Sequence, residues 1–384
     1  MSSTQSVRLG IIGLGNIARQ HIGHITGGEV PQCRIEALCS RQVHPLAAEL
    51  GVPHFDDYRA LIDSGLCDAV LVATPTFTHL QTGEYALRAG LHLLMEKPIG
   101  LSVEEGERLL AANTGAQVFA VMLNQRVDPL FVTMRDILQR AELGDIKRCH
   151  WNMTNWFRPE IYFQVSDWRA TWRGEGGGLL VNQCIHNLDI LQWLCGMPRR
   201  INAFCEFGKY HAIEVEDEAT AYLEFPGGAT GVFIGSTGEA PGSNRLEIVG
   251  DHGSLLFDGE RLWRTRNSPS TSEYSRSTRD MFGMPDSQTI DITPDRSVNQ
   301  HARVLSNFVQ SIRAGEPLIA PAREGLASLS LANAMLLSTW ERRAVELPLD
   351  RARYQAALDE RVRHSTLREK ADIKAHVDMS RSYR

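Results

Sequence analysis

A short apolar run that breaks into a glycine-rich turn constrains the fold of this chain more than any other feature. Residues 7–12 are apolar and rich in β-formers, and GLGNIA follows directly at residues 13–18. This order predicts a strand, a tight turn at Gly13 and the start of a helix, with Gly15 leaving room for a ligand at the backbone. The free N–H groups at the start of such a helix favour a pyrophosphate. The segment therefore predicts a dinucleotide site that includes Gly13, Gly15, Asn16 and Ile17.

Apolar strands alternate with helices over the first 124 residues. After the strand at 7–12, strands are expected at 35–39, 68–74, 92–95 and 117–122, and helices at 79–89 and 103–112. Buried strands that alternate with helices favour a parallel, doubly wound sheet. We therefore predict an α/β fold whose amino-terminal dinucleotide-binding domain spans residues 1–124.

The pattern changes after residue 125. Expected strands follow one another through short Gly or Pro turns, at 146–156, 201–207, 219–225, 230–236, 245–249 and 254–257. The expected helices lie at 129–141, 179–194, 299–314 and 324–341, and the last two are expected to close this second domain. This succession predicts an α+β domain over residues 125–350 with an open, mostly antiparallel sheet. We expect an exposed loop at 265–280 and a charged carboxyl-terminal tail at 351–384, either a surface helix or a partner arm.

Composition excludes several classes of protein. With 384 residues, 43% hydrophobic and 22% charged, the chain is expected to be a soluble protein of two folded domains. A net charge of −6 without a long basic block argues against nucleic acid, and no apolar window is long enough to span a membrane. The seven cysteines are scattered and no secretory signal precedes the first strand, so we expect a cytoplasmic protein without a metal site.

The end of the second expected strand bears on the choice of dinucleotide. An NAD site usually offers a carboxylate there, but this chain has Ser40 followed by Arg41. A 2′-phosphate would meet a hydroxyl and a guanidinium, so NADP is favoured over NAD. The alternative is that Arg41 is a solvated loop residue or stacks on adenine, and that either cofactor is accepted.

Two further segments contain side chains that can act as acids, bases or cations in a reaction. Glu96-Lys97-Pro98 follows the fourth expected strand, at the edge where an open α/β sheet binds its ligands. The second segment, GGGLLVNQCIHNLD at residues 176–189, leads from a glycine loop into an expected helix. Asn182, His186 and Asp189 are spaced four and three residues apart, which predicts that they share one helix face.

With these motifs the chain resembles the family of glucose-fructose oxidoreductase, inositol dehydrogenase and MocA. The likeness extends to about Leu349 and rests on GLGNIA, EKP, the GGG that precedes QCIHNLD, and a closing pattern of Phe308, Gly315, Pro317 and Trp340. The resemblance implies a Rossmann domain joined to a domain whose open sheet mediates oligomer contacts, hence a homodimer or homotetramer. It also implies NAD(P)-dependent oxidoreduction of sugars, cyclitols or related polyols.

The resemblance assigns roles to individual residues. Lys97 matches the catalytic lysine and His186 the acid/base histidine, whereas Asn182 stands where many members have aspartate. An amide cannot take a proton, so Asn182 would orient a substrate hydroxyl. Asp189 would either orient the His186 ring or close the helix face against the core. The other expected cofactor contacts are Ser40, Arg41, Thr74, Pro75, His79, Glu96, Lys97 and Asn124.

Aromatic and basic residues before the glycine loop suggest a sugar site. Aromatic faces stack on sugar rings, and Arg donates to hydroxyls or anionic groups. Core packing of each tryptophan, and a hinge role for residues 124–126, are the alternatives. The expected substrate contacts are Arg126, Trp156, Arg158, Trp172, Asn182 and His186.

These observations leave three functions open. The first is a dehydrogenase that transfers hydride between a nicotinamide cofactor and a secondary hydroxyl of a sugar, glycoside or cyclitol. The second is a glycosidase that retains NAD(P) and runs transient oxidation, elimination, hydration and reduction. It needs an extra base, for which Tyr162 or His211 is a candidate without sequence support. The third, a cofactor-binding sensor without turnover, fits least because Lys97 and His186 are both present.

Overall fold

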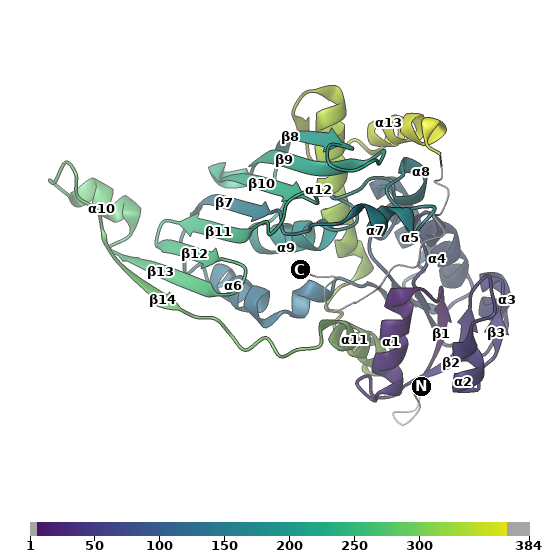
Figure 1. The fold of residues 1–384 in the computed structure, drawn as a ribbon. Helices are drawn as coiled ribbons and strands as arrows, with labels where there is room; N and C mark the ends of the chain where they lie inside the picture. The colour runs from purple at the N-terminus through teal and green to yellow at the C-terminus, as the bar shows by residue number, and fades with distance from the viewer. Residues whose placement is uncertain (1–5, 367–384) are drawn as a thin grey trace.

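Two sheets organise this computed structural model, which describes residues 6–366 (Figure 1). The first sheet is parallel throughout and has the strand order β3-β2-β1-β4-β5-β6. Its strands are β1 (Val7–Ile12), β2 (Cys33–Cys39), β3 (His54–Phe55), β4 (Ala69–Val72), β5 (His92–Met95) and β6 (Phe119–Val121). The strand order reverses between β1 and β4, and in such sheets a crevice opens there at the carboxyl ends of the strands.

Helices cover both faces of this sheet, as the alternation in the sequence predicted. They are α1 (Asn16–Thr26), α2 (Pro45–Leu50), α3 (Tyr58–Asp63), α4 (His79–Arg88) and α5 (Val103–Ala112), with the short 3₁₀ turns η1 (Thr76–Thr78) and η2 (Asn124–Val127). One more helix comes from far along the chain. In α11 (Gln300–Ala314), Ala302, Leu305 and Phe308 pack in the same core as β1. The expectation that this helix closes the second domain was therefore wrong.

The second sheet has nine strands in the order β14-β13-β12-β11-β7-β10-β9-β8-β15. Only the β7–β10 pair is parallel among its described strands, so the prediction of a mostly antiparallel sheet is confirmed. The strands are β7 (Ile146–Met153), β8 (Arg200–Phe207), β9 (Glu216–Glu224), β10 (Thr230–Ser236), β11 (Asn244–Gly250), β12 (Gly253–Phe257), β13 (Leu262–Ser268), β14 (Asp286–Asp291) and β15 (Val345–Glu346).

One face of the second sheet is covered and the other is open. Cys149, Trp151 and Met153 of β7 are buried on the covered side, where α12 and α9 pack, whereas Phe204 (66% exposed) and Tyr222 (45% exposed) lie on the open side. Alternation of this kind is expected for a sheet with one solvated face. The helices of this half are α6 (Pro129–Gln139), α7 (Glu160–Gln164), α8 (Trp172–Glu175), α9 (Ile185–Cys195), α10 (Thr271–Ser277), α12 (Ala322–Glu341) and α13 (Arg351–His364), with the 3₁₀ turn η3 (Pro226–Gly228).

Two local predictions were wrong. The helix expected at 179–194 begins only at Ile185, because the buried Glu216 carboxylate accepts hydrogen bonds from Gly178 N (2.8 Å) and Leu180 N (2.9 Å) and holds the preceding residues in turns. The loop expected at 265–280 contains the end of β13 and all of α10, at the far end of a hairpin that extends from the body (Figure 1). β14 is exposed along its whole length, so no apolar alternation marked this hairpin.

The expected tail divides at residue 366. Residues 351–364 form α13, which packs on the body through buried Tyr354 and Leu358, and Tyr354 stacks on Trp340 with 5.5 Å between ring centres. The rest of the tail lies outside the described residues. Between residues 6 and 366 no helix is long and apolar enough to cross a membrane.

Candidate functional site

A cavity of about 1390 Å³ joins the glycine turn to the chemical groups named above. One end is lined by the loop after β1 and by residues that follow β2, β3 and β4. The other end is lined by Lys97, His186 and the segment around α7 and α8. The crevice at the strand ends and the second domain thus enclose one continuous space.

The glycine turn fits the phosphate end of a dinucleotide. Gly13 has φ +94°, and a Cβ there would lie 2.5 Å from Ala73 O, so no side chain fits. A Cβ on Gly15, by contrast, would have no protein atom within 4 Å. α1 begins at Asn16, and its first N–H groups lack intrahelical partners. Gly13, Gly15, Asn16 and Ile17 all line the cavity.

Ser40 and Arg41 line the part of the cavity where the end of β2 meets β3, and they are not alone there. Asp56 and Asp57, which sequence reasoning missed, follow β3 and line the same region. Ser40 N donates to Phe55 O (3.1 Å), which brings the two strand ends together. A strand of two residues gives no periodic signal, so these carboxylates could not be placed from the sequence.

The expected cofactor contacts on the neighbouring loops divide into two groups. Thr74 and Pro75 line the cavity, whereas His79 and Asn124 are buried outside its lining. The two ring nitrogens of His79 lie 2.9 Å from Pro98 O and 3.0 Å from Thr74 O, and Asn124 Nδ2 donates to Gln300 Oε1 (2.9 Å). The side chains of His79 and Asn124 therefore form hydrogen bonds behind the cavity wall and do not face the cavity.

Glu96 is buried at the centre of the cavity wall. His21 Nε2 donates to Glu96 Oε1 (2.7 Å), and the rings of His21 and His301 pack edge to face with 5.5 Å between their centres. Burial raises the pKa of Glu96, but the hydrogen bond from His21 and nearby positive charge outweigh it, so the pKa lies below its ordinary value. Burial lowers the pKa of His301 to about 4. His301 was missed, because it comes from α11, far along the chain.

Lys97 and His186 meet at the far end of the cavity. Lys97 Nζ donates to the backbone oxygen of Asn182 (2.8 Å), and burial lowers the pKa of Lys97 to about 8. His186 lies in the first turn of α9 and is 4% exposed. Burial, followed by the charge of Lys97, holds the pKa of His186 well below its ordinary value, so the imidazole is neutral. Its Nδ1 is buried with no partner among residues 6–366.

Asn182 is bound to a carboxylate that the sequence analysis did not select. Its Nδ2 donates to Glu175 Oε1, and Glu175 Oε2 accepts from Ala170 N (2.6 Å). Burial raises the pKa of Glu175. The buried Glu175 side chain lines the cavity beside Asn182.

Aromatic and guanidinium groups form the remaining wall. The Arg158 guanidinium carbon lies 5.1 Å from the centre of the Trp156 ring and 5.3 Å from that of Tyr162. The Arg169 guanidinium carbon lies 4.8 Å from the centre of the Tyr162 ring and 4.5 Å from that of Trp168. Flat apolar faces beside fixed donors suit a ring that carries hydroxyl groups.

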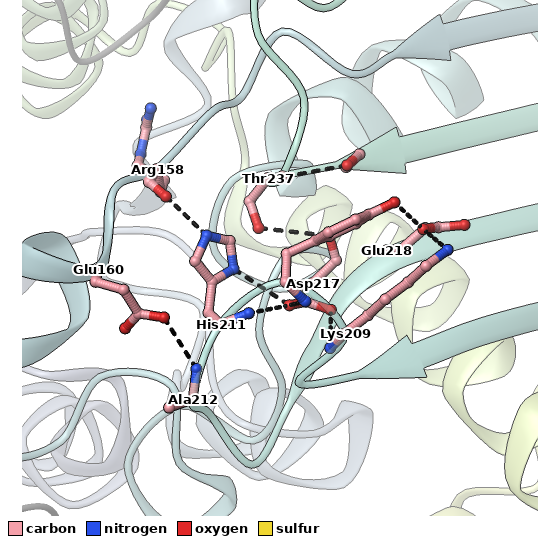
Figure 2. A network of polar contacts seen from close by, with 11 residues as sticks. Arg158, Glu160, Lys209, His211, Ala212, Asp217, Glu218 and Thr237 are labelled. Carbon is pink, nitrogen blue, oxygen red and sulfur yellow. Dashed lines mark hydrogen bonds and ion pairs between the residues drawn. The ribbon is translucent and has the colours of Figure 1, made fainter.

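The loop that carries Arg158 is held by its backbone (Figure 2). Arg158 N donates to Thr237 O (3.0 Å), and Arg158 O accepts from His211 Nε2 (2.8 Å). The other ring nitrogen of His211 lies 3.2 Å from Asp217 Oδ2. His211 is therefore engaged on both sides and lies outside the cavity lining.

Comparison with known proteins places this geometry in a family. The family model for the oxidoreductase NAD-binding Rossmann fold matches residues 7–124, and that for the GFO/IDH/MocA C-terminal domain matches residues 131–256. The chain belongs to the Gfo/Idh/MocA family. It is an NAD(P)-binding oxidoreductase, as the motifs predicted.

Two curated relatives and one solved structure illustrate this membership. The chain is 25% identical to an inositol 2-dehydrogenase of Rhizobium meliloti, over 89% of this chain and 99% of the relative. It is 27% identical to a scyllo-inositol 2-dehydrogenase (NADP⁺) of Bacillus subtilis, over 73% and 79%. The structure of the WlbA dehydrogenase from Bordetella pertussis, in complex with NADH and UDP-GlcNAcA, superposes with a TM-score of 0.76 at 25% identity, over 90% of this chain and all of that one.

Besides His79 and Asn124, three residues expected in this Gfo/Idh/MocA site lie outside the cavity lining. Arg126 Nε and Nη2 donate to Asp189 Oδ2 (2.7 Å) and Oδ1 (2.6 Å). Of the two roles expected for Asp189, this buried ion pair favours closing the helix face against the core over orienting His186. Because α9 begins only at Ile185, Asn182 lies before the helix and does not share a helix face with His186. Trp172 packs between Phe207 and Trp340, with ring centres 5.7 and 5.5 Å away, in the core. None of Arg126, Asp189 and Trp172 lines the cavity.

Proposed function

We propose that the chain is a dehydrogenase that transfers hydride between NAD(P) and a secondary hydroxyl of a sugar, glycoside or cyclitol. The observation that carries the proposal is the placement of Lys97 and His186 in the same cavity as the glycine turn. When bound, the nicotinamide supplies the hydride acceptor or donor. The task of the chain is then to hold the substrate oxygen and to move its proton.

Lys97 and His186 divide this task. The Lys97 ammonium, fixed on Asn182 O, stabilises negative charge on the substrate oxygen as its proton leaves. The neutral His186 takes that proton. We assign the proton to Nε2, because Nδ1 is buried and has no hydrogen-bond partner among residues 6–366. The rings of Trp156 and Trp168 would cover the substrate, and Arg158 and Arg169 would donate to its substituents.

The retained-cofactor glycosidase receives less support from the geometry. Of its two candidate bases, His211 is engaged by Arg158 O and Asp217, away from the cavity. Tyr162 does line the cavity, but its hydroxyl accepts from Arg169 Nη1 (2.9 Å) and Gln183 Nε2 (3.3 Å). We therefore retain net dehydrogenation as the proposed function.

We further propose that NADP is preferred over NAD, because β2 ends without a carboxylate and Arg41 offers a guanidinium there. The Ser40 hydroxyl contributes less, since it donates to Gln42 O (2.7 Å). Asp56 and Asp57 face the same part of the cavity and would oppose a 2′-phosphate. The preference should therefore be modest, about tenfold.

We also propose that the open face of the second sheet binds a second copy of the chain. Exposed aromatic side chains such as Phe204 and Tyr222 are typical of surfaces that are covered in an assembly. Light scattering at micromolar concentration should give the mass of a dimer or tetramer. A particle with the mass of one chain would contradict this.

A substrate panel tests the proposed reaction. Sugars, glycosides and cyclitols are incubated with the enzyme and each cofactor, and the absorbance of reduced nicotinamide is followed. Net formation of NAD(P)H with at least one member would support the dehydrogenase. Cleavage of a glycoside without any net change in NAD(P)H would instead identify the redox-neutral glycosidase.

A further inference from the structure

A buried carboxylate, Glu175, lies beside Asn182 in the cavity. The Asn182 amide carries no negative charge, so it cannot itself supply one to Lys97. Glu175 is 4% exposed and lines the cavity next to Asn182. It ends the short helix α8, directly before Gly176, whose φ of +71° turns the chain away. The inference developed from this pair rests on the proposed function.

The contacts of Glu175 fix the orientation of the Asn182 amide. Glu175 Oε1 accepts from Asn182 Nδ2, and Oε2 accepts from Ala170 N (2.6 Å). An amide group has a donor end and an acceptor end. Because Nδ2 is bound to the carboxylate, Oδ1 is the end that can accept a hydrogen bond from a substrate hydroxyl.

The charge of Glu175 also acts on Lys97. Asn182 lies between the two groups, since its side chain binds Glu175 and its backbone oxygen accepts from Lys97 Nζ. Arg158 and Arg169 are the nearby cations that disfavour the Lys97 ammonium, whereas Glu96 and Glu175 are the anions that favour it. His186 and His301 are buried and neutral, and the Glu96 carboxylate is hydrogen bonded to His21.

We propose that Glu175 is a positioning residue, which orients the Asn182 amide and supplies the negative charge that keeps Lys97 protonated. Glu175 acts through Asn182 and Lys97 and takes no proton from the substrate.

An exchange of the two side chains tests this directly. Glu175→Gln keeps an oxygen that can accept from Asn182 but removes the charge, so kcat should fall about 10- to 100-fold with little change in the KM for cofactor. Asn182→Asp alone places two carboxylates in contact, which disfavours ionisation of both, and should also lower kcat. In the double variant Glu175→Gln/Asn182→Asp the amide and carboxylate trade places, and kcat should return to within about threefold of wild type.

A matched variant controls for the loss of a carboxylate elsewhere. Glu105 is half-buried, accepts from Leu101 N (2.8 Å) and lies outside the cavity lining. Glu105→Gln should leave kcat unchanged. If the double variant is no faster than the slower single variant, or if Glu175→Gln turns over like wild type, the proposal is wrong.

A second measurement needs no turnover and separates this proposal from the proposed function. Competitive labelling of the Lys97 amine at a series of pH values reports its pKa by mass spectrometry. Removal of a nearby anion should lower that pKa in Glu175→Gln, and the double variant should restore it. An unchanged Lys97 pKa in Glu175→Gln would overturn the inference. Failure to find any sugar substrate would count against the proposed function alone.

Discussion

The dinucleotide end of the cavity is built mainly from backbone, whereas the end that holds Lys97 and His186 is built from side chains of separate elements. At the first end, Gly13, Gly15 and the start of α1 are neighbours in sequence, and the geometry follows from φ angles and free N–H groups. At the second, Lys97 follows β5, Glu175 ends α8 and His186 begins α9. Because the two ends are built from different residues, substitutions at one end should change cofactor binding and substitutions at the other should change the chemical step.

The largest expected effect is on chemistry alone. Lys97→Ala and His186→Ala should each lower kcat by about 10² or more, because each removes a group that holds the substrate oxygen or its proton. Cofactor binding, measured by fluorescence titration, should stay within a few-fold of wild type, since the glycine turn is untouched. Near-normal turnover in both variants would remove the basis for the assignment.

The next effect falls on the backbone end, where two glycines form a matched pair. Gly13→Ala puts a Cβ 2.5 Å from Ala73 O at a positive φ, and should cost about 1–3 kcal/mol of stability even without ligand. Gly15→Ala meets no protein atom within 4 Å, so its thermal unfolding should match wild type while cofactor affinity falls. Equal unfolding temperatures for both variants would contradict this account of the turn.

The pH dependence is expected to come from the chemical end. Burial places the pKa of Lys97 near 8, below its ordinary value, so the ammonium is present below that pH and is lost as pH rises through it. The kcat/KM for the alcohol should therefore fall above pH of about 8, by up to tenfold per unit. Lys97→Arg keeps the positive charge at all these pH values and should abolish this limb, even at a lower rate. If kcat/KM of Lys97→Arg still falls above pH of about 8, another titrating group causes the fall.

The smallest effect concerns the choice of cofactor. Ser40→Asp adds a carboxylate at the end of β2, where it can bind the ribose diol of NAD and repel the 2′-phosphate of NADP. The expected preference of about tenfold for NADP should reverse, and high salt should weaken it in the wild type. Titration of both proteins with both cofactors measures this. A wild type that binds NAD at least as tightly would show that Asp56 and Asp57 outweigh Arg41.

The same contrast explains what the sequence could reveal. The glycine turn was predictable because one contiguous segment encodes strand, turn and helix start. Five of the six strands of the first sheet also followed from local pattern, whereas β3, α2 and α3 were not predicted. Lys97 and His186 were found through short motifs at strand and helix ends. Each of these motifs could be recognised because its residues are neighbours in the sequence.

Residues that act through distant partners could not be found in this way. His301 reaches the cavity from α11, and nothing near it in sequence points to Glu96 or Lys97. Glu175 stands beside a glycine loop, but its bond to Asn182 depends on how α8 ends and on how late α9 begins. Arg126 and Asp189 resemble site residues in sequence, and only the fold shows that they bind each other.

Isotope transfer tests the central claim, that one cavity joins a dinucleotide to the Lys97–His186 pair for hydride transfer. The substrate found in the panel is prepared with deuterium on its carbinol carbon, and the NAD(P)H formed is analysed by mass spectrometry. The account predicts one deuterium per NAD(P)H in the wild type, and formation of the same labelled product at least about 100-fold more slowly in Lys97→Ala. Unlabelled NAD(P)H from the wild type, or labelled NAD(P)H formed at the wild-type rate in Lys97→Ala, would contradict it.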